Sequence, residues 1–167
     1  MSQEKQVLKK VEQRTTQQKD SLSIEWYKYD KGLIKASSNN KYIFLFFRTR
    51  FCKWCNTMEQ KTFLDKEVIR RLDKSFVCIK VDIDSDDKTM ELKGKRISDR
   101  DVAFMYNVFG YPYSVFLESD QKSIGVLPGY VPTSDFLLLL EYIGDSHHKK
   151  EKFEDFLKEK RQEAKKK

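Results

Sequence analysis

The sequence lacks the features of a membrane-spanning protein and of a secreted precursor. None of its 167 residues belongs to a run of roughly 18 consecutive apolar residues, the length that a transmembrane helix requires. The most apolar stretch, Phe136 to Leu140, is bounded by Asp135 and Glu141. Residues 2–20 are polar and do not resemble a secretory signal peptide. We therefore expect either a cytoplasmic protein or the processed form of an exported one.

Cysteine and histidine are scarce. Three cysteines, an odd and small number, exclude a framework of several disulfides. A structural zinc site needs four ligands, usually in two closely spaced Cys/His pairs. Besides Cys52 and Cys55, the chain offers only Cys78, His147 and His148, which form no such second pair. Glycine-rich phosphate loops and dinucleotide fingerprints are also absent, so no nucleotide cofactor is expected.

The positive charge does not gather on the body of the chain. The net charge is +7, but residues 1–20 contribute +2 and residues 149–167 contribute +4, which leaves the 128 residues between them at +1. A nucleic-acid-binding face would need the basic residues clustered on the folded domain. We therefore expect no nucleic-acid partner, and 167 residues suffice for one domain with extensions.

The central feature is a pair of cysteines at a predicted strand-to-helix junction. Tyr42 to Phe47 is a continuous apolar run, which predicts a strand buried on both faces. Cys52 and Cys55 follow it, three residues apart, at the start of a predicted helix, where a disulfide can join them. Free N–H groups at the helix start, together with Lys53, would stabilise a Cys52 thiolate. An activated thiol with a second thiol in reach is suited to thiol–disulfide exchange.

The remaining pattern alternates strands with helices. Strands are predicted near residues 24–27, 76–81, 113–117 and 123–127, and residues 85–97 are expected to form a loop. The expected helix N-caps are Asp30, Asp65, Ser98, and either Thr133 or Ser134. This order predicts an α/β fold with a mixed central sheet flanked by helices.

Finer expectations concern helix faces and domain limits. In the helix after Ser98, Val102, Met105 and Tyr106 are expected to face inward. Cys78, within a predicted strand, is expected to be a buried, inert cysteine. We expect a polar N-terminal tail (1–20), a domain (21–144), and a C-terminal amphipathic helix with a Lys-rich tail (145–167).

With these elements in order, the sequence resembles the thioredoxin family over roughly residues 24–144. The resemblance rests on the buried strand before the cysteine pair and on four further motifs. The motifs are Cys52-Lys53-Trp54-Cys55, Lys80-Val81-Asp82-Ile83-Asp84, Val108-Phe109-Gly110-Tyr111-Pro112, and Gly129 before the last helix of the domain. The resemblance implies a thioredoxin fold and a thiol–disulfide oxidoreductase that reduces or exchanges disulfides in partner proteins.

A narrower resemblance is to the SoxW-type thioredoxins associated with bacterial sulfur oxidation. It rests on Trp26, Gly32-Leu33, Met58-Glu59, Leu127-Pro128-Gly129-Tyr130 with Phe136, and the added helix at Phe153. This subgroup implies a periplasmic protein whose signal peptide has been removed, with a cytoplasmic one as the alternative. The implied partners are disulfide-containing proteins and a thiol electron donor, for example a membrane thiol transporter. We expect a monomer.

Carried over by position, the thioredoxin resemblance implies that Cys52 is the nucleophile and Cys55 the resolving thiol. Pro112 would be a cis-proline facing their disulfide, and the backbone of Tyr111 would pair with an extended substrate segment. Without the resemblance, Pro112 would be an ordinary strand-start proline. No cofactor is implied beyond the redox-active disulfide itself, and no metal.

The sequence departs from the thioredoxin pattern at three places, one of which is Phe51 in place of the common tryptophan before the first cysteine. Phe46 stands where many thioredoxins keep a buried aspartate that assists proton transfer with the resolving cysteine, so this helper is absent or replaced. Lys80 matches a lysine usually found near that aspartate, although an exposed strand-end lysine is the alternative. The Lys53-Trp54 pair matches no familiar pair between the two cysteines, which leaves the direction of electron flow open.

Two other kinds of function stay open. The chain could be a thioredoxin-fold binding module that grips a partner with Trp54, Tyr111 and Tyr130 while the disulfide is structural. It could also carry a metal on the two thiolates with help from His147 or His148, although solvated histidines are commoner in such a polar segment.

Overall fold

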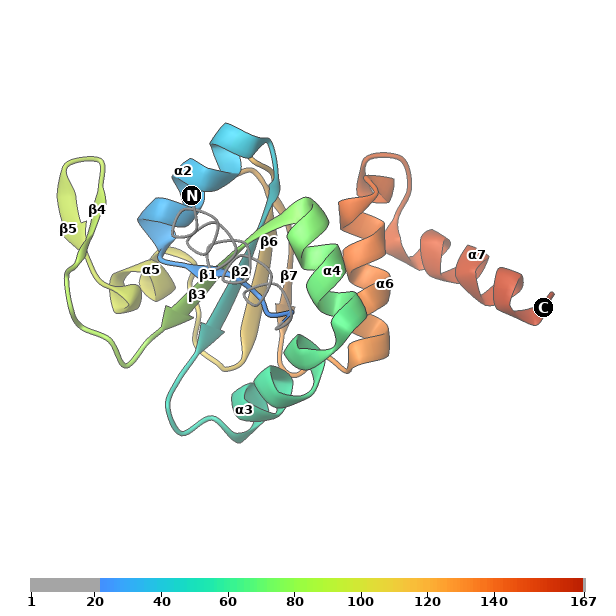
Figure 1. The fold of residues 1–167 in the computed structure, drawn as a ribbon, viewed down its shortest axis with the longest axis horizontal. Coiled ribbons are helices and arrows are strands. Elements are labelled where there is room, and N and C mark those ends of the chain that lie inside the picture. The colour runs from blue at the N-terminus through green and yellow to red at the C-terminus, as the bar shows by residue number, and fades with distance from the viewer. Residues whose placement is uncertain (1–21, 167) are drawn as a thin grey trace, which may run out of the picture.

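The computed structural model of the protein describes residues 22–166 (Figure 1). The predicted N-terminal tail, residues 1–20, lies outside them. The described strands are β1 (Trp26–Tyr27), β2 (Tyr42–Arg48), β3 (Phe76–Asp82), β4 (Met90–Leu92), β5 (Lys95–Ile97), β6 (Tyr113–Leu117) and β7 (Ser123–Pro128). The α-helices are α2 (Tyr29–Asn39), α3 (Lys53–Gln60), α4 (Lys66–Ser75), α5 (Asp99–Met105), α6 (Thr133–Gly144) and α7 (Phe153–Lys165), and the 3₁₀ turns are η1 (Thr62–Leu64) and η2 (His147–Lys149).

The core is a five-stranded mixed sheet in the order β1-β3-β2-β6-β7. β1 and β2 run parallel to β3, whereas β6 runs antiparallel to β2 and β7. The predicted α/β architecture with a mixed sheet flanked by helices is therefore confirmed. β2 is the central strand, which explains why its sequence is continuously apolar.

The alternating side chains of β2 feed two hydrophobic clusters, one on each face of the sheet. Phe44 and Phe46 belong to the cluster that α3, α4 and α6 cover, and Ile43, Leu45 and Phe47 belong to the cluster beneath α2 and α5 (Figure 1). All five side chains are completely buried. The prediction of a strand buried on both faces is confirmed.

Two of the four predicted helix caps are confirmed. The carboxylate of Asp65 accepts the N–H groups of Glu67 and Val68, and Ser98 forms a capping box with Asp101. The other two predictions were wrong. The N-cap of α2 is Lys28, and Asp30 lies inside its first turn. Pro132, and not Thr133 or Ser134, precedes α6. Neither helix start has a side-chain hydrogen bond from its N-cap residue.

The segment predicted as a loop, residues 85–97, contains the β4–β5 hairpin, which projects from the sheet in Figure 1. Leu92 pairs with Lys95, so the turn is the two-residue Lys93-Gly94, and both residues have positive φ (50° and 75°). Such turns match the twist of a hairpin and favour glycine. The polar composition of this segment gave no sign of the two short strands. The one indication in the sequence was Gly94, a residue that favours hairpin turns.

The inner face of α5 differs from the prediction at one position. Val102 and Ala103 are buried and Tyr106 is half-buried, but Met105 is 50% exposed. With only seven residues, α5 turns a narrow face to the sheet, and Met105 falls outside it. At the C-terminus, α7 docks through Phe156, which is buried against Tyr142 of α6, while Phe153 and Leu157 are half-buried.

Strand register brings three chain segments to one end of the sheet. Arg48 at the end of β2 lies opposite Asp82 at the end of β3, and Phe47 lies opposite Tyr113 at the start of β6. The loop that leads to the cysteines, the acidic segment after β3 and the Tyr111-Pro112 segment therefore all leave or enter the sheet at the same edge.

Candidate functional site: a cysteine pair at the end of the central strand

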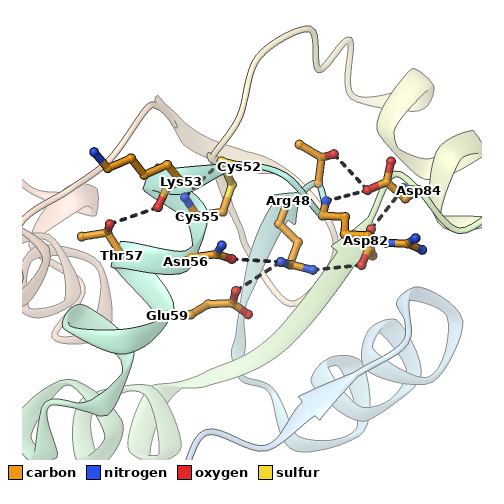
Figure 2. The surroundings of a disulfide bond; sticks show 11 residues. Arg48, Cys52, Lys53, Cys55, Asn56, Thr57, Glu59, Asp82 and Asp84 are labelled. Carbon is orange, nitrogen blue, oxygen red and sulfur yellow. Dashed lines mark hydrogen bonds and ion pairs between the residues drawn. A yellow bond between two sulfur atoms is a disulfide. The ribbon is translucent and has the colours of Figure 1, made fainter.

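Cys52 and Cys55 form a disulfide at the start of α3, with their Cα atoms 5.2 Å apart (Figure 2). Cys52 is the N-cap of the helix, and its Sγ accepts the N–H of Cys55 at 3.0 Å. This contact satisfies one of the N–H groups that a helix start leaves free. Cys52 is half-buried, whereas Cys55 is completely buried. A partner can therefore approach Cys52 but not Cys55.

The residues between the cysteines point outward. Lys53 is exposed, and Figure 2 shows its amino group directed away from the disulfide. Its charge therefore lies farther from Cys52 than the sequence alone implied. Trp54 is 54% exposed and packs against Tyr130, with the ring centroids 5.3 Å apart.

Two phenylalanines on the chain segments that meet at this sheet edge are largely exposed. Phe51, directly before Cys52, is 90% exposed, and Phe109, three residues before Pro112, is 84% exposed. Large apolar side chains in such positions are typical of protein-binding surfaces. The sequence reasoning noted Phe51 only as a departure from a motif and assigned no role to Phe109. The available signal was the position of Phe109 next to the Gly110-Tyr111-Pro112 breaker.

The Tyr111–Pro112 peptide bond is cis, and Pro112 is buried. The pairing of Phe47 with Tyr113 puts this bond at the sheet edge where the chain leaves for Cys52. Tyr111 and Cys52 also pack against the same hydrophobic cluster. The structure thus brings together the Tyr111-Pro112 segment and the cysteine loop, which are about 60 positions apart in the sequence.

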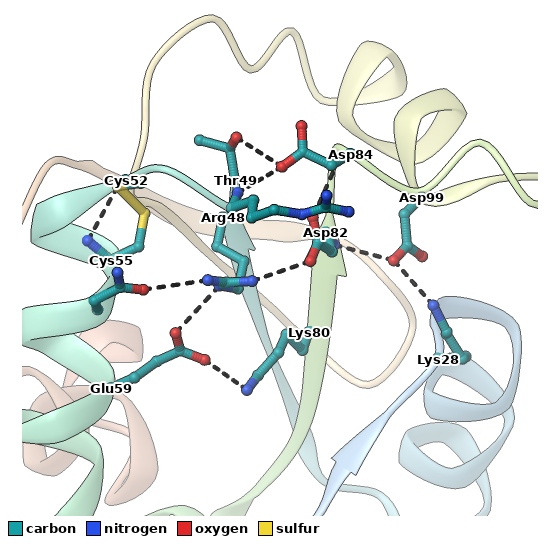
Figure 3. Close-up of polar contacts among 12 residues, drawn as sticks. Lys28, Arg48, Thr49, Cys52, Cys55, Glu59, Lys80, Asp82, Asp84 and Asp99 are labelled. Carbon is teal, nitrogen blue, oxygen red and sulfur yellow. Dashed lines mark hydrogen bonds and ion pairs between the residues drawn. A yellow bond between two sulfur atoms is a disulfide. The ribbon is translucent and has the colours of Figure 1, made fainter.

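Lys80 does not point freely into solvent but takes part in a charge cluster beneath α3. Its Nζ lies 2.6 Å from Glu59 Oε1 and 4.8 Å from the centre of the Trp26 ring. Arg48 lies on the other side of Glu59, with its Nε 3.1 Å from Glu59 Oε2, and its Nη1 donates to Asp82 Oδ2 at 3.0 Å (Figure 3). We name Arg48, Glu59, Lys80 and Asp82 the strand-end charge cluster. The sequence reasoning identified only Lys80 in it.

Asp84, which follows β3, forms hydrogen bonds to the loop that contains Phe51. Its Oδ2 accepts the backbone N–H of Arg50 at 2.5 Å and the hydroxyl of Thr49 at 2.9 Å. Both hydrogen bonds lower the pKa of the Asp84 carboxyl, and the one from the Arg50 backbone has the larger effect. A carboxyl whose pKa is lowered by folding stabilises the folded state at pH values above its unfolded-state pKa. This stabilisation is lost as the pH falls through the lowered pKa of the folded state. The loop therefore stays fastened at neutral pH.

The two histidines lie at the opposite end of β2 from the cysteines. The His148 ring stacks edge-on against Tyr42, the first residue of β2, and its Nε2 lies 2.9 Å from Glu118 Oε1. His147 Nδ1 lies 3.0 Å from Glu151 Oε1. Across residues 22–166, no group of three or more His, Cys, Asp or Glu side chains is arranged to hold a metal ion. The histidines therefore cannot assist the two thiolates in this conformation.

Within the same described range, no helix combines the length and apolar character needed to cross a bilayer. Cys78 lies in β3 with 4% of its surface exposed, as predicted for a buried cysteine.

The mixed five-stranded sheet, with a cysteine pair at the helix start after its central strand, defines a thioredoxin-fold protein. The chain belongs to the family Thioredox_DsbH, described as a protein of unknown function, DUF255, whose model matches residues 5–166. A thioredoxin-fold protein from Helicobacter pylori is similar in structure, with 28% identity, a TM-score of 0.61, and coverage of 84% of this chain and 85% of that one.

Two longer proteins are similar in sequence. An uncharacterized protein of Caenorhabditis elegans, B0495.5, is 34% identical over 110 residues, which are 60% of this chain and 13% of that protein. The thiol:disulfide interchange protein DsbD of Campylobacter jejuni is 27% identical over 124 residues, which are 74% of this chain and 20% of that protein. The chain thus spans a fifth or less of the length of these two relatives.

Proposed function

We propose that this protein is a thiol–disulfide oxidoreductase that acts on disulfides of partner proteins through Cys52 and Cys55. The observation that carries the proposal is the asymmetry of the pair: Cys52 is accessible at the N-cap of α3, and Cys55 is completely buried behind it. A helix start favours a thiolate on Cys52, and a buried second thiol is protected from external disulfides but can reach Cys52. The similarity to a thiol:disulfide interchange protein supports this chemistry.

The chemistry runs in two steps. The Cys52 thiolate attacks a partner disulfide, forms a mixed disulfide and releases one partner thiolate. Cys55 then attacks Cys52 Sγ, which forms the Cys52–Cys55 disulfide and releases the second partner thiol. Two electrons pass from the protein dithiol to the partner. A dithiol donor must then reduce the protein again, and the disulfide is the only redox group that the proposal requires.

The partner binds, in this proposal, on the rim of aromatic side chains around Cys52. Phe51 and Phe109 are exposed on chain segments that meet at this sheet edge, and Trp54 rests on Tyr130. An extended partner segment would pair with the backbone of Tyr111 beside the cis peptide bond at Pro112. Such a surface fits apolar, extended segments on both sides of a partner cysteine.

The compartment and the electron donor are part of the proposal. We propose a periplasmic protein that takes its electrons from a membrane thiol transporter, as the SoxW-type resemblance implies. The similarity to the DsbD of Campylobacter jejuni, named for thiol:disulfide interchange, supports the exchange chemistry. A cytoplasmic location is the alternative. The narrower SoxW-type resemblance stays a prediction, because the family match supports the wider class only.

Replacing the two cysteines separately tests the function. Cys52→Ser should abolish the reduction of a protein disulfide such as that of insulin, because the attacking thiol is missing. Cys55→Ser should instead trap the mixed disulfide, which mass spectrometry detects as a covalent adduct. Undiminished reduction by Cys52→Ser would overturn the assignment.

The binding-module alternative rests on the Trp54–Tyr130 contact, and the reduction potential separates it from an oxidoreductase. A value near about −270 mV, as in thioredoxin, indicates a reductase, and one near about −120 mV indicates an oxidant or isomerase. A pair that does not equilibrate with a dithiol buffer, together with partner binding that persists without the disulfide, would favour the binding module.

A further inference from the structure

An apolar groove runs between α7 and the rest of the domain. One wall contains Leu127 of β7 and Leu138 of α6, and the other contains Phe153, Leu157 and Ala164 of α7. The groove has a volume of about 600 Å³, and we name it the α6–α7 groove. Figure 1 shows α7 projecting away from the other described elements, so none of them covers the groove. Exposed apolar surfaces of this kind are typical of docking sites.

The length and lining of the α6–α7 groove suit an amphipathic helix. Its lining residues on α7 run from Phe153 to Ala164, which is about three helical turns. Phe153 and Leu157 are half-buried and Ala164 is exposed, so the domain covers the apolar stripe of α7 only in part. A helix that lies in the groove with its apolar face inward would complete this burial.

Two charged side chains on α7 indicate what that helix is. Glu154 and Arg161 are seven residues apart, nearly two full turns, so they share one side of α7. Arg161 lines the groove, and both side chains are exposed. Within residues 22–166, neither takes part in an ion pair, whereas other charged residues of α7 do, namely Asp155, Lys158, Lys160 and Glu163. The flank of the groove therefore carries one unpaired charge of each sign.

A second copy of α7, running antiparallel, satisfies both charges at once. Glu154 lies three residues before Leu157, and Arg161 lies four residues after it. A two-fold axis beside Leu157 therefore places Glu154 of each copy opposite Arg161 of the other. The same arrangement sets the acidic first turn of each helix against the basic last turn of its partner and opposes the two helix dipoles. A symmetric contact of this kind closes after two copies.

We propose that two copies of this chain associate through α7, each helix lying antiparallel in the α6–α7 groove of the other copy. The inference is independent of the proposed function. It departs from the monomer expected from the sequence, where the terminal helix was expected to serve its own domain alone. No residue of α3 or of the Tyr111-Pro112 segment lines the groove, so we expect the dimer to keep both cysteine pairs accessible.

Charge reversal on α7 tests the pairing in the full chain. Sedimentation velocity over a concentration series should show a monomer–dimer equilibrium for the unmodified protein. Arg161→Glu and Glu154→Arg should each raise the Kd of the dimer about tenfold or more at low salt, because the two-fold axis turns two attractions into two repulsions. High salt should reduce this difference by screening the charges.

Mixing the two variants gives the sharper result. In an equimolar mixture of Arg161→Glu with Glu154→Arg, each copy carries two like charges that match the opposite charges of the other. The mixture should therefore dimerise although each variant alone does so poorly, and the double variant should dimerise like the unmodified protein. Only antiparallel pairing of α7 with itself predicts this recovery.

Glu159→Arg is the matched control, with the same charge change as Glu154→Arg. Glu159 is exposed, does not line the groove, and follows Leu157 by two residues, so it lies on the opposite side of α7. This variant should leave the Kd of the dimer within about threefold of the unmodified value, since an exposed charge away from the contact has little effect.

A monomer at every concentration would overturn the inference and leave the groove to an occupant other than a second copy. A dimer that both single variants leave intact, no recovery in the mixture, or equal weakening by Glu159→Arg would also overturn it. None of these results bears on disulfide reduction by Cys52 and Cys55, which the cysteine variants test separately.

Discussion

Two buried cysteines in this chain have different surroundings, and this difference decides their chemistry. Cys55 is bonded to an accessible partner and lies one helical turn from the charged side chain of Glu59. Cys78 lies within β3 between β1 and β2, opposite Trp26 and Phe44 in the register. Burial is the main reason that the pKa of the Cys78 thiol is raised far above its usual range. Only the first of these environments can support thiolate chemistry.

Selective alkylation should therefore distinguish Cys52 from Cys78. After reduction at pH 8, iodoacetamide should label Cys52 first, while Cys78 stays unlabelled until the protein unfolds, because its raised pKa and burial leave almost no accessible thiolate. Peptide mass spectrometry measures the labelling at each position. Equal labelling rates for Cys52 and Cys78 in the folded protein would contradict the prediction, and Cys78→Ala provides the control.

At the scale of elements, α2 approaches β3 more closely than a side chain on Gly32 would allow. A Cβ at Gly32 would stand 2.3 Å from Ile79 Cγ1 and 3.3 Å from Tyr27 Cβ. Ile79 is completely buried in the centre of the sheet and cannot swing away. The glycine therefore sets the distance between the helix and the sheet.

We expect Gly32→Ala to lower the free energy of unfolding by about 1–3 kcal/mol, the usual cost of overpacking a core. This loss should appear even though alanine favours a helix interior over glycine by roughly 1 kcal/mol. Gly125→Ala is the control, because no atom lies within 4 Å of the corresponding Cβ position in β7. Urea unfolding measures both. An unchanged or higher stability of Gly32→Ala would show that α2 can shift.

At the scale of the whole molecule, β2 joins the two halves of the core. Its side chains alternate between the cluster under α3, α4 and α6 and the cluster under α2 and α5. Neither cluster can lose its packing without exposing one face of the same strand. The described domain should therefore unfold as one cooperative unit.

Fluorescence of Trp26 can test this cooperativity. The chain has two tryptophans, so Trp54→Phe leaves Trp26, which packs between Phe63 and Phe46, as the single reporter. Its urea transition should coincide with the loss of helix measured by far-ultraviolet circular dichroism. An earlier transition in circular dichroism alone would show that a peripheral element, such as α7, unfolds separately.

Local sequence determined much of the fold and the centre of the candidate site. The apolar run of β2, the caps at Asp65 and Ser98, and the position of Cys52 and Cys55 at a helix start could all be inferred, because neighbours in the chain dictate them. The resemblance to thioredoxins also pointed to the Tyr111-Pro112 segment. The β4–β5 hairpin was missed, since strands of three residues carry too little periodicity to detect.

Only the tertiary structure decided which charged groups meet beneath the cysteines. Arg48, Glu59 and Lys80 come from β2, α3 and β3, and their meeting depends on the register of two parallel strands and on how α3 lies across them. The outward position of Met105 and the separation of the histidines from the cysteines depend on packing in the same way. Propensity and spacing act over a few residues, whereas such contacts are fixed by the packing of segments far apart in the chain.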